Sequence, residues 1–248
     1  MNTHALIKDT WLSQLDARVP RYTSYPTAPH FHKGVTAATV NSWLERTDMS
    51  EPLSLYLHIP FCSKLCWYCG CNTTITKTYA PVRPYLETLL AELSLIVERL
   101  PGRGRLSHLH FGGGTPSLLS PEDFRRVMDA IGKHFDFVDR AEISIEIDPR
   151  GFTISRAKAY GEAGVTRASI GVQDFDAEVQ RAIHRLQPYE MVAKTVDALR
   201  KNGVMPVNFD LIYGLPHQTE KTITESVEAT VKLGANRVAL FGYAHVPW

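Results

Sequence analysis

The chain has 248 residues, with 27 Lys and Arg against 26 Asp and Glu, so its formal net charge at neutral pH is +1. This balance, without any run of Lys or Arg, gives no indication of binding to a nucleic-acid backbone. No apolar run reaches the roughly 18–20 residues that cross a bilayer. The N-terminus also lacks the basic start and apolar stretch of a secretory signal. We therefore expect no membrane association and a cytoplasmic location. In that reducing compartment, clustered cysteines are metal ligands or redox groups more often than disulfides.

Residues 1–50 are expected to form an N-terminal arm and a short helix, separate from residues 51–248. The segment Arg21–Phe31, RYTSYPTAPHF, is rich in aromatic residues and proline and has no helical period. We therefore expect it to be extended. It either packs on the surface or crosses the mouth of an active site.

From about Thr36 onward, short apolar strands alternate with amphipathic helices. The pattern predicts six strands, which are Leu53–Ile59, Leu106–Phe111, Ala141–Ile147, Arg167–Val172, Pro206–Ile212 and Arg237–Tyr243. Helices are predicted between them, from near Pro84 to Leu100, from Pro121 onward, and over Ser155–Ala163, Asp176–His184, Pro188–Asn202 and Glu220–Leu233.

Repeated strand–helix units with right-handed crossovers predict an α/β fold with a parallel sheet covered by helices. The pattern does not decide between a curled partial barrel and a flat, doubly wound sheet. The helix that would follow the sixth strand is missing, and the chain stops at Val246-Pro247-Trp248. We expect a truncated chain or a fragment.

All four cysteines, Cys62, Cys66, Cys69 and Cys71, lie within ten residues that follow the first predicted strand. The carboxyl ends of parallel strands are where active sites form in such sheets. A Cys-x3-Cys-x2-Cys spacing on one loop lets three thiolates converge on one inorganic cluster, because soft iron–sulfur clusters take thiolate ligands. Three ligands to a four-iron cube leave one iron open.

Other interpretations of the cysteines stay open, namely a zinc knuckle or a set of free thiols. Zinc usually takes paired Cys or His ligands from two separated places, and the sequence offers no second pair. His58 lies nearby, but within a strand, where packing is its expected role. Cys71 is a fourth ligand, a spare thiol or a residue of the substrate pocket.

A second motif, Phe111-Gly-Gly-Gly-Thr-Pro-Ser117, follows the second predicted strand. Glycines let a ligand approach the backbone closely, although a plain turn is the commoner explanation of such a run. Polar residues that share one edge of the sheet are best explained by a common site. Arg185 either binds a carboxylate as a fork-shaped donor or, as its sequence position alone favours, is a solvated charge at a helix end. The polar residues at strand ends are Glu146, Asp148, Gln173, Asp174, Asp210, Tyr243 and His245.

The spacing Cys62-x3-Cys66-Trp-Tyr-Cys69 resembles the signature of radical S-adenosylmethionine (SAM) enzymes, and the glycine motif resembles their methionine-binding segment. Several stretches together are similar to the oxygen-independent coproporphyrinogen III oxidases of that superfamily. They are RYTSYPTAPHF, LYLHIPFC, CGC, FGGGTPS, EISIEIDPR, SIGVQDF, FDLIYGLP and YAHVPW, and they span Arg21–Trp248. The resemblance implies an incomplete six-stranded parallel (β/α)6 barrel, a [4Fe–4S] cluster and two SAM molecules per active site.

The resemblance also implies residue roles. The cluster would be held by Cys62, Cys66 and Cys69. The SAM bound to the cluster would be held by Tyr56, Gly113 and Glu146. The second SAM would be held by Tyr68, Gly114, Thr115, Gln173, Arg185, Asp210 and Ala244.

The reaction implied by the resemblance converts two propionate side chains of coproporphyrinogen III to vinyl groups, giving protoporphyrinogen IX and two CO2 in haem biosynthesis. The partners implied are the porphyrinogen and an electron donor such as a flavodoxin or ferredoxin, and we expect a monomer. The family continues into a mostly helical C-terminal domain that helps enclose the substrate, so we expect this chain to turn over poorly.

Two alternatives to this reaction remain. A haem chaperone, which is a carrier protein, shares Cys-x3-Cys-x2-Cys but typically lacks the CGC cysteine and the RYTSYPTAP arm, both of which are present here. The other alternative is a radical SAM enzyme that acts on a different substrate.

Overall fold

A computed structural model describes residues 26–244 of the chain. These residues divide between two compact units, with the boundary between Trp43 and Leu44. Helix α2 (Ala37–Glu45) runs across this boundary. Among the helices of residues 26–244, none combines the length and the apolar character needed to cross a membrane.

The N-terminal arm is not extended throughout, and our expectation for Arg21–Phe31 was wrong at its C-terminal end. Residues Ala28–His30 form a short 3-10 helix, η2, with a proline in its first turn. The fixed φ of proline suits that position, and the backbone N–H of Phe31 donates to the carbonyl of Ala28 over 3.0 Å. Residues 21–25 of the expected arm lie outside the described part of the chain.

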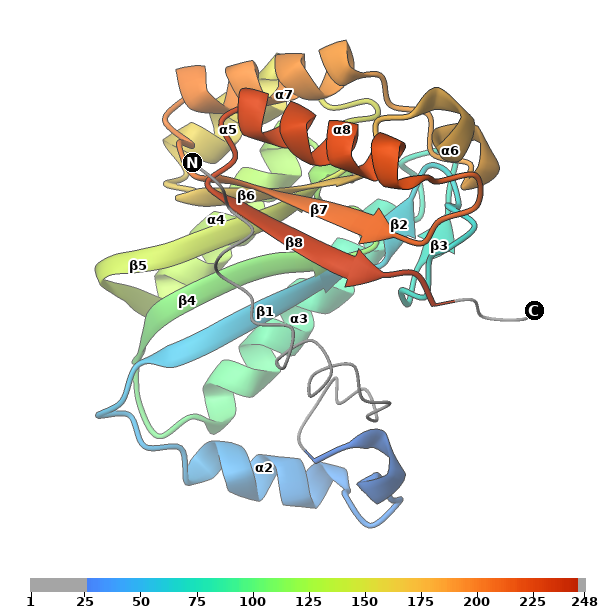
Figure 1. The fold of residues 1–248 in the computed structure, drawn as a ribbon. Coiled ribbons are helices and arrows are strands. Elements are labelled where there is room, and N and C mark those ends of the chain that lie inside the picture. Colours follow the sequence, from blue (N-terminus) through green and yellow to red (C-terminus); the bar gives the residue numbers. More distant parts are fainter. Residues whose placement is uncertain (1–25, 245–248) are drawn as a thin grey trace, which may run out of the picture. The chain divides into compact units, whose positions relative to one another are not determined.

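The second unit is built on one parallel sheet whose strands follow each other in sequence order (Figure 1). A doubly wound sheet would reverse its strand order at a switch point, so the unbroken order decides for the curled, barrel-like alternative. Right-handed crossovers in one direction also keep the helices on one face. The expected six-stranded parallel α/β fold is therefore confirmed. Its strands are β1 (Leu53–Ile59), β4 (Gly104–Gly113), β5 (Phe135–Ile147), β6 (Arg167–Gln173), β7 (Val207–Tyr213) and β8 (Arg237–Gly242).

The helices of this unit begin and end where local chemistry favours it. The Ser120 hydroxyl accepts a hydrogen bond from the Asp123 backbone N–H over 3.1 Å, which caps α4. Gly164, Gly203 and Gly234 follow helices with φ of +78°, +88° and +72°, which glycine adopts without strain. The helices are α3 (Val82–Arg99), η3 (Pro116–Leu118), α4 (Pro121–His134), α5 (Ile154–Glu162), α6 (Ala177–Ala182), α7 (Tyr189–Lys201) and α8 (Glu220–Lys232).

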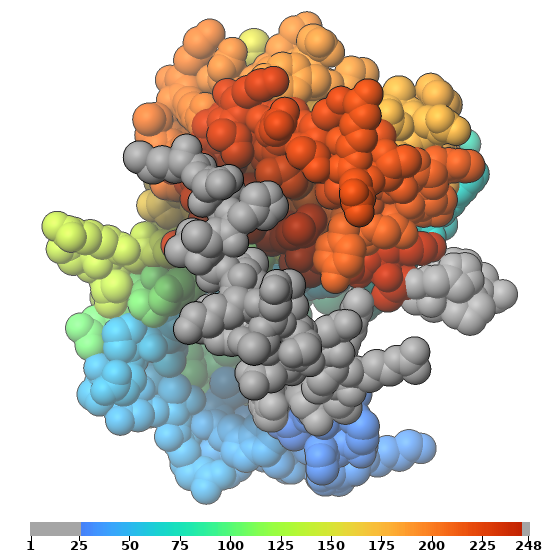
Figure 2. Space-filling model, in the orientation of Figure 1, coloured from blue at the N-terminus to red at the C-terminus, as the bar shows by residue number. Residues whose placement is uncertain are grey.

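The core lies between the sheet and these helices. Phe111 of β4 and Tyr160 of α5 both pack on Phe124 of α4, with ring centroids 5.1 Å and 4.6 Å from it. All three side chains are fully buried. Figure 2 shows α8 (orange-red) on the surface of this unit, and its inner side contacts β7. The apolar faces of the predicted helices therefore pack against the sheet.

Two features of the sheet were not predicted. Strand β5 begins at Phe135, six residues earlier than expected, because Phe135 and Phe137 pair with Gly104 and Leu106 of β4. A second, two-stranded parallel sheet joins β2 (Phe61–Cys62) to β3 (Thr74–Ile75). Strands of two residues are too short to show a period of two in the sequence.

Candidate active site

The cysteine loop leaves the carboxyl end of β1 and is closed at its base by the small β2–β3 sheet. The backbone N–H of Thr74 donates to the carbonyl of Pro60 over 2.7 Å, and that of Thr76 donates to the carbonyl of Cys62 over 2.9 Å. Within the loop, the N–H of Cys69 donates to the carbonyl of Cys66 over 3.0 Å. The chain between Cys62 and Thr74 is therefore held as a closed loop over the sheet edge.

A cavity of about 370 Å³ lies at this edge of the sheet, where the expected common site should be. Its walls combine the cysteine loop, the glycine motif and the ends of β5, β6 and β7. The predicted residues on the wall are Cys62, Cys66, Tyr68, Cys69, Gly113, Gly114, Thr115, Glu146, Gln173, Arg185 and Asp210, together with Cys71. A larger groove of about 770 Å³ lies elsewhere, beside α5 and α7, and contains none of these residues.

Two predicted residues, Tyr56 and Ala244, lie off the wall of this cavity. The Tyr56 ring stacks on His110, with centroids 5.7 Å apart, and His110 Nε2 lies 3.2 Å from Glu146 Oε1. A Cβ at Gly112 would lie 2.7 Å from the Tyr56 ring and 3.1 Å from the Glu146 carboxylate. The missing side chain at Gly112 therefore lets Tyr56 stand beside Glu146. Ala244 follows β8 and is exposed.

The next two glycines of the motif pack against the base of the cysteine loop. Gly113 has a φ of +121°, and a Cβ there would lie 2.9 Å from the backbone N and O of Ile59. Gly114 donates its N–H to the Ile59 carbonyl over 2.9 Å, and a Cβ on it would lie 3.0 Å from the backbone of Phe61. Glycine is thus required here by close backbone approach. As a result, the motif and the cysteines share one wall.

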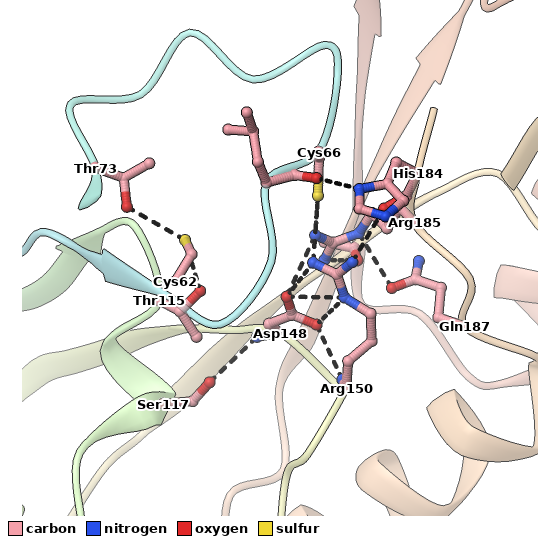
Figure 3. Close-up of polar contacts among 12 residues, drawn as sticks. Cys62, Cys66, Thr73, Thr115, Ser117, Asp148, Arg150, His184, Arg185 and Gln187 are labelled. Atoms are coloured by element: carbon pink, nitrogen blue, oxygen red, sulfur yellow. Dashed lines mark hydrogen bonds and ion pairs between the residues drawn. The ribbon is translucent and has the colours of Figure 1, made fainter. Parts of the chain in front are cut away.

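Each cysteine of the Cys-x3-Cys-x2-Cys motif has its own polar partners, and those of Cys62 and Cys66 are drawn in Figure 3. Cys62 Sγ lies 3.1 Å from Thr115 Oγ1 and 3.3 Å from Thr73 Oγ1. Cys66 Sγ accepts hydrogen bonds from two guanidinium groups. A hydrogen bond with Cys71 is the main cause that lowers the pKa of Cys69 to about 6. Hydrogen bonds and nearby positive charge favour thiolates, which are the form that binds iron.

The two guanidinium groups belong to Arg150 and Arg185, and Asp148 lies between them (Figure 3). Asp148 Oδ2 lies 2.6 Å from Arg150 Nη2 and 3.4 Å from Arg185 Nη1, and the exposed fraction of each of the three side chains is 10% or less. Burial alone would raise the pKa of Asp148, but Arg185 and Arg150 hold it below its ordinary value. The carboxylate is therefore charged.

Arg185 is not the solvated helix-end charge that its sequence position alone favours, and that expectation was wrong. Its Nη2 donates to the Gly171 carbonyl over 2.6 Å, and its Nε donates to Gln187 Oε1 over 3.1 Å. Gln187 is fully buried and donates in turn to the carbonyl of Val172. These contacts fix the guanidinium on the cavity wall beside Cys66.

The turn that carries Arg185 also holds the cysteine loop from outside. The backbone N–H of Trp67 donates to the Ile183 carbonyl over 3.0 Å. The His184 ring nitrogen Nδ1 lies 2.7 Å from the carbonyl of Leu65. His184 has a φ of +56°, uncommon for a residue other than glycine.

Asp210 on β7 stands beside Gly171 of β6 in the sheet register. Burial, together with the charge of Glu146, raises the pKa of Asp210 to about 6. Gln173, at the end of β6, is buried and has a φ of +69°. The carboxylates and this amide point into the cavity as hydrogen-bond acceptors and donors for a polar ligand.

Some polar residues at strand ends serve the fold instead of the cavity. Asp174 is fully buried; its Oδ1 accepts from the Asp176 N–H over 2.6 Å and from the Ser226 hydroxyl over 3.0 Å. It therefore connects β6 to α6 and α8. His245 lies outside the described residues.

Several residues of the site were not predicted from the sequence. Arg150, His184, Gln187 and Thr73 were not singled out, and each contacts the cysteine loop or its supports. The signal for Arg150 was present, since it follows Asp148 by two residues directly after a predicted strand. The others are isolated polar residues in loops, and no spacing marks them.

The chemistry of the donor set fits an iron–sulfur cluster. Within residues 26–244, no three or more His, Cys, Asp or Glu side chains are placed to bind one metal ion together. The ligands of a four-iron cube each bind a different iron, so they need not meet at one point. Three thiols lie on one wall of the cavity. Two buried guanidinium groups contact one of them, Cys66, and can balance the negative charge of a cluster bound by thiolates.

The comparisons with known proteins agree with the site. Residues 56–230 match the model of the radical SAM superfamily, and these residues include the whole cysteine loop and the strand ends up to Asp210. The chain therefore belongs to the radical SAM superfamily. Membership implies a [4Fe–4S] cluster and SAM as the cofactors of this site.

The particular relatives are oxygen-independent coproporphyrinogen III oxidases. The chain is 48% identical to the one from Paracoccus denitrificans, over 96% of this chain and 52% of the relative. It is 47% identical to the one from Bradyrhizobium diazoefficiens, over 96% and 53%. The solved coproporphyrinogen III oxidase of Escherichia coli, described as a radical SAM enzyme, matches with a TM-score of 0.87 and 37% identity, over 96% and 53%. The chain thus spans about half the length of these relatives.

Proposed function

We propose that this protein carries out the radical SAM chemistry of oxygen-independent coproporphyrinogen III oxidation. In this reaction two propionate side chains become vinyl groups, giving protoporphyrinogen IX and two CO2. The observation that carries the proposal is the cavity in which the Cys-x3-Cys-x2-Cys thiols, the glycine motif and the polar ends of three strands share one wall. The identity to the oxidases over almost the whole chain supports the choice of substrate.

Cys62, Cys66 and Cys69 would hold the cluster, and Cys71 would stay a free thiol of the pocket. When bound, the cluster and SAM would together supply a radical able to remove one hydrogen atom from each propionate. The carbon that loses this hydrogen is adjacent to the pyrrole ring, so the unpaired electron is delocalised. Loss of CO2, with one further electron passing to an acceptor outside the chain, would then leave the vinyl group.

The other residues of the wall would bind and orient SAM. Gly113 exposes backbone where a methionine moiety could approach, and Glu146 stands beside it as an acceptor for an ammonium or hydroxyl group. Tyr56 would close this side through its stack with His110. We propose a second SAM on the residues that resemblance assigns to it, namely Tyr68, Gly114, Thr115, Gln173, Arg185, Asp210 and Ala244.

The protein must also exclude water and oxygen from the reacting carbon. Tyr68, an aromatic residue on the cavity wall, suits this role. Its ring packs against a group of buried apolar side chains, namely Val179, Ile183, Ile212 and Leu215. A porphyrinogen substrate, an electron donor such as a flavodoxin or ferredoxin, a monomeric state and a cytoplasmic location complete the proposal.

The test is an anaerobic assay of the reconstituted chain with coproporphyrinogen III, SAM and excess reductant, in which oxidised protoporphyrin is followed by its fluorescence. Product that depends on SAM, and that is lost in a Cys66→Ser variant, would support the proposal. Stable transfer of added haem, without SAM cleavage or decarboxylation, would contradict it and favour a haem carrier. Because we expect slow turnover, long incubations are needed, and SAM cleavage without even slow formation of protoporphyrin would contradict the proposed substrate.

A further inference from the structure

Arg150 is the buried cation of the cavity that neither the cysteine pattern nor the family resemblance assigns to a role. Its Nη2 donates to Cys66 Sγ over 3.2 Å, and its Nε and Nη2 lie 2.6–3.1 Å from the carboxylate oxygens of Asp148. Its Nη1 donates to the His184 carbonyl over 3.3 Å. One guanidinium thus joins the end of β5, the cysteine loop and the turn after α6 (Figure 3).

Arg150 and Arg185 both line the cavity, and each nitrogen of both guanidinium groups contacts the protein. They differ in that the resemblance implies a SAM contact for Arg185 and none for Arg150. A guanidinium with every nitrogen bound to the protein, and only 10% of the side chain exposed, is a fixed charge. Its effect is therefore exerted through the groups that it touches.

The charges in direct contact are unbalanced without Cys66. Arg150 and Arg185 bring two positive charges, and Asp148 brings one negative charge. Buried charges are costly unless they are paired. A thiolate at Cys66, which accepts from Arg150 over 3.2 Å and from Arg185 over 3.3 Å, brings the set to neutrality. The surroundings of Cys66 are thus built for a sulfur that carries negative charge.

We propose that Arg150 is a positioning residue that holds Cys66 as a negatively charged ligand and makes the bound cluster easier to reduce. The inference rests on the proposed role of Cys66 as a cluster ligand. The reduction potential of an iron–sulfur cluster depends on its net charge and on hydrogen bonds to its sulfurs. A reduced cluster carries one more negative charge, so a buried N–H donor and cation against a ligand sulfur favours the reduced state.

Asp148 should also change the reduction potential of the bound cluster, but in the opposite direction from Arg150. Its carboxylate holds Arg150 in place but also adds a negative charge close to Cys66. Removing this charge while keeping both arginines should therefore make reduction easier still. A role of Arg150 and Asp148 in folding alone would not produce shifts of opposite sign.

The experiment is a redox titration of the anaerobically reconstituted 248-residue chain, with the reduced cluster followed by EPR. We expect Arg150→Gln to keep its iron and to be about tenfold harder to reduce, which for one electron is a midpoint lower by about 59 mV. Arg150→Lys keeps the positive charge but cannot contact Cys66 and Asp148 through separate nitrogens as the guanidinium does. Its midpoint potential should therefore lie between those of Arg150→Gln and the unmodified chain. Asp148→Asn should have a higher midpoint than the unmodified chain.

The matched control is Arg126→Gln, which removes a surface guanidinium paired to Glu87 at 2.5 Å, away from the cavity. Its midpoint should equal that of the unmodified chain. A fully loaded Arg150→Gln protein with an unchanged midpoint would overturn the inference. Should Arg150→Gln fail to fold, an Asp148→Asn midpoint equal to or below that of the unmodified chain would overturn it. An unmodified chain that forms no cluster would contradict the proposed function itself and the inference with it.

Discussion

The indole of Trp67 stacks on the imidazole of His184, with ring centroids 5.2 Å apart and ring planes 20° from parallel. Trp67 lies between Cys66 and Cys69 in the sequence, whereas His184 precedes Arg185 in the turn after α6. The stack, the backbone bond from Trp67 to Ile183 and the His184 contact with the Leu65 carbonyl hold the cysteine loop against the barrel. The loop is therefore fixed from a segment more than a hundred residues away.

The stack predicts that His184→Ala weakens the cysteine loop. The substitution removes one aromatic contact, about 0.5–1.5 kcal/mol, and one hydrogen bond, about 0.5–1.5 kcal/mol. We expect the free energy of unfolding of the cluster-free protein to fall by roughly 1–3 kcal/mol, and iron to be lost faster to a chelator. Urea unfolding and chelator kinetics measure both. His108→Ala, at an exposed site on β4, is the control, and equal losses in the two variants would contradict the role of the stack.

The glycine motif predicts a backbone requirement at Gly113. A side chain at its φ of +121° is strained, and a Cβ there would lie 2.9 Å from the backbone of Ile59. Gly113→Ala should therefore lower the free energy of unfolding by about 1–3 kcal/mol. Gly102→Ala is matched to it, because nothing lies within 4 Å of a Cβ at that position. Denaturant titrations that show the same small change for both variants would argue against the close approach.

Asp210 predicts a pH dependence of stability. Burial raises its pKa to about 6 in the folded protein, so the folded state binds a proton more tightly than the unfolded state. The contribution of Asp210 to the free energy of unfolding is fully present below its unfolded pKa of about 3.9. This contribution is lost as the pH rises through about 6. Asp210→Asn should thus gain about 1–2 kcal/mol over the unmodified chain at about pH 7.5 and little at about pH 4.

The measurement for Asp210 is urea unfolding of the cluster-free protein across this pH range. The control is Asp197→Asn, at an exposed position of α7. A difference between Asp210→Asn and the unmodified chain that does not grow with pH would show that the carboxylate is not desolvated.

The sequence predicted the sheet well because each strand of β1, β6, β7 and β8 is a short apolar run closed by turn residues. It also placed the cysteines and the glycine motif at one edge, because strands of a parallel sheet share their carboxyl ends. The early start of β5 was not predicted, because Phe135 follows the last residue of α4 directly and its extended backbone depends on pairing with Gly104 of β4. Contacts such as Arg150 to Cys66 join residues 84 positions apart, and no local pattern encodes them.

We predict that Glu146 contributes to the binding of SAM beside the cluster. It lines the cavity on β5, 3.2 Å from His110 Nε2, at the side where Tyr56 stands. Hydrogen bonds to a charged group contribute about 1.5–3 kcal/mol, so Glu146→Gln should weaken SAM binding by roughly 10- to 100-fold. SAM titrations followed by EPR of the reduced protein measure this. Glu142→Gln, on the same strand but paired to Arg167 at 2.6 Å, is the control. An unchanged SAM affinity in Glu146→Gln would contradict the assignment.

The central claim is that Cys62, Cys66 and Cys69 hold a [4Fe–4S] cluster with one iron open. It is tested most directly by iron content and low-temperature EPR of the dithionite-reduced chain after anaerobic reconstitution. The account predicts about four irons per chain, an EPR signal that changes when SAM is added, full loading of Cys71→Ala and no cluster in Cys66→Ala. Full iron in Cys66→Ala, or loss of the cluster in Cys71→Ala, would contradict it.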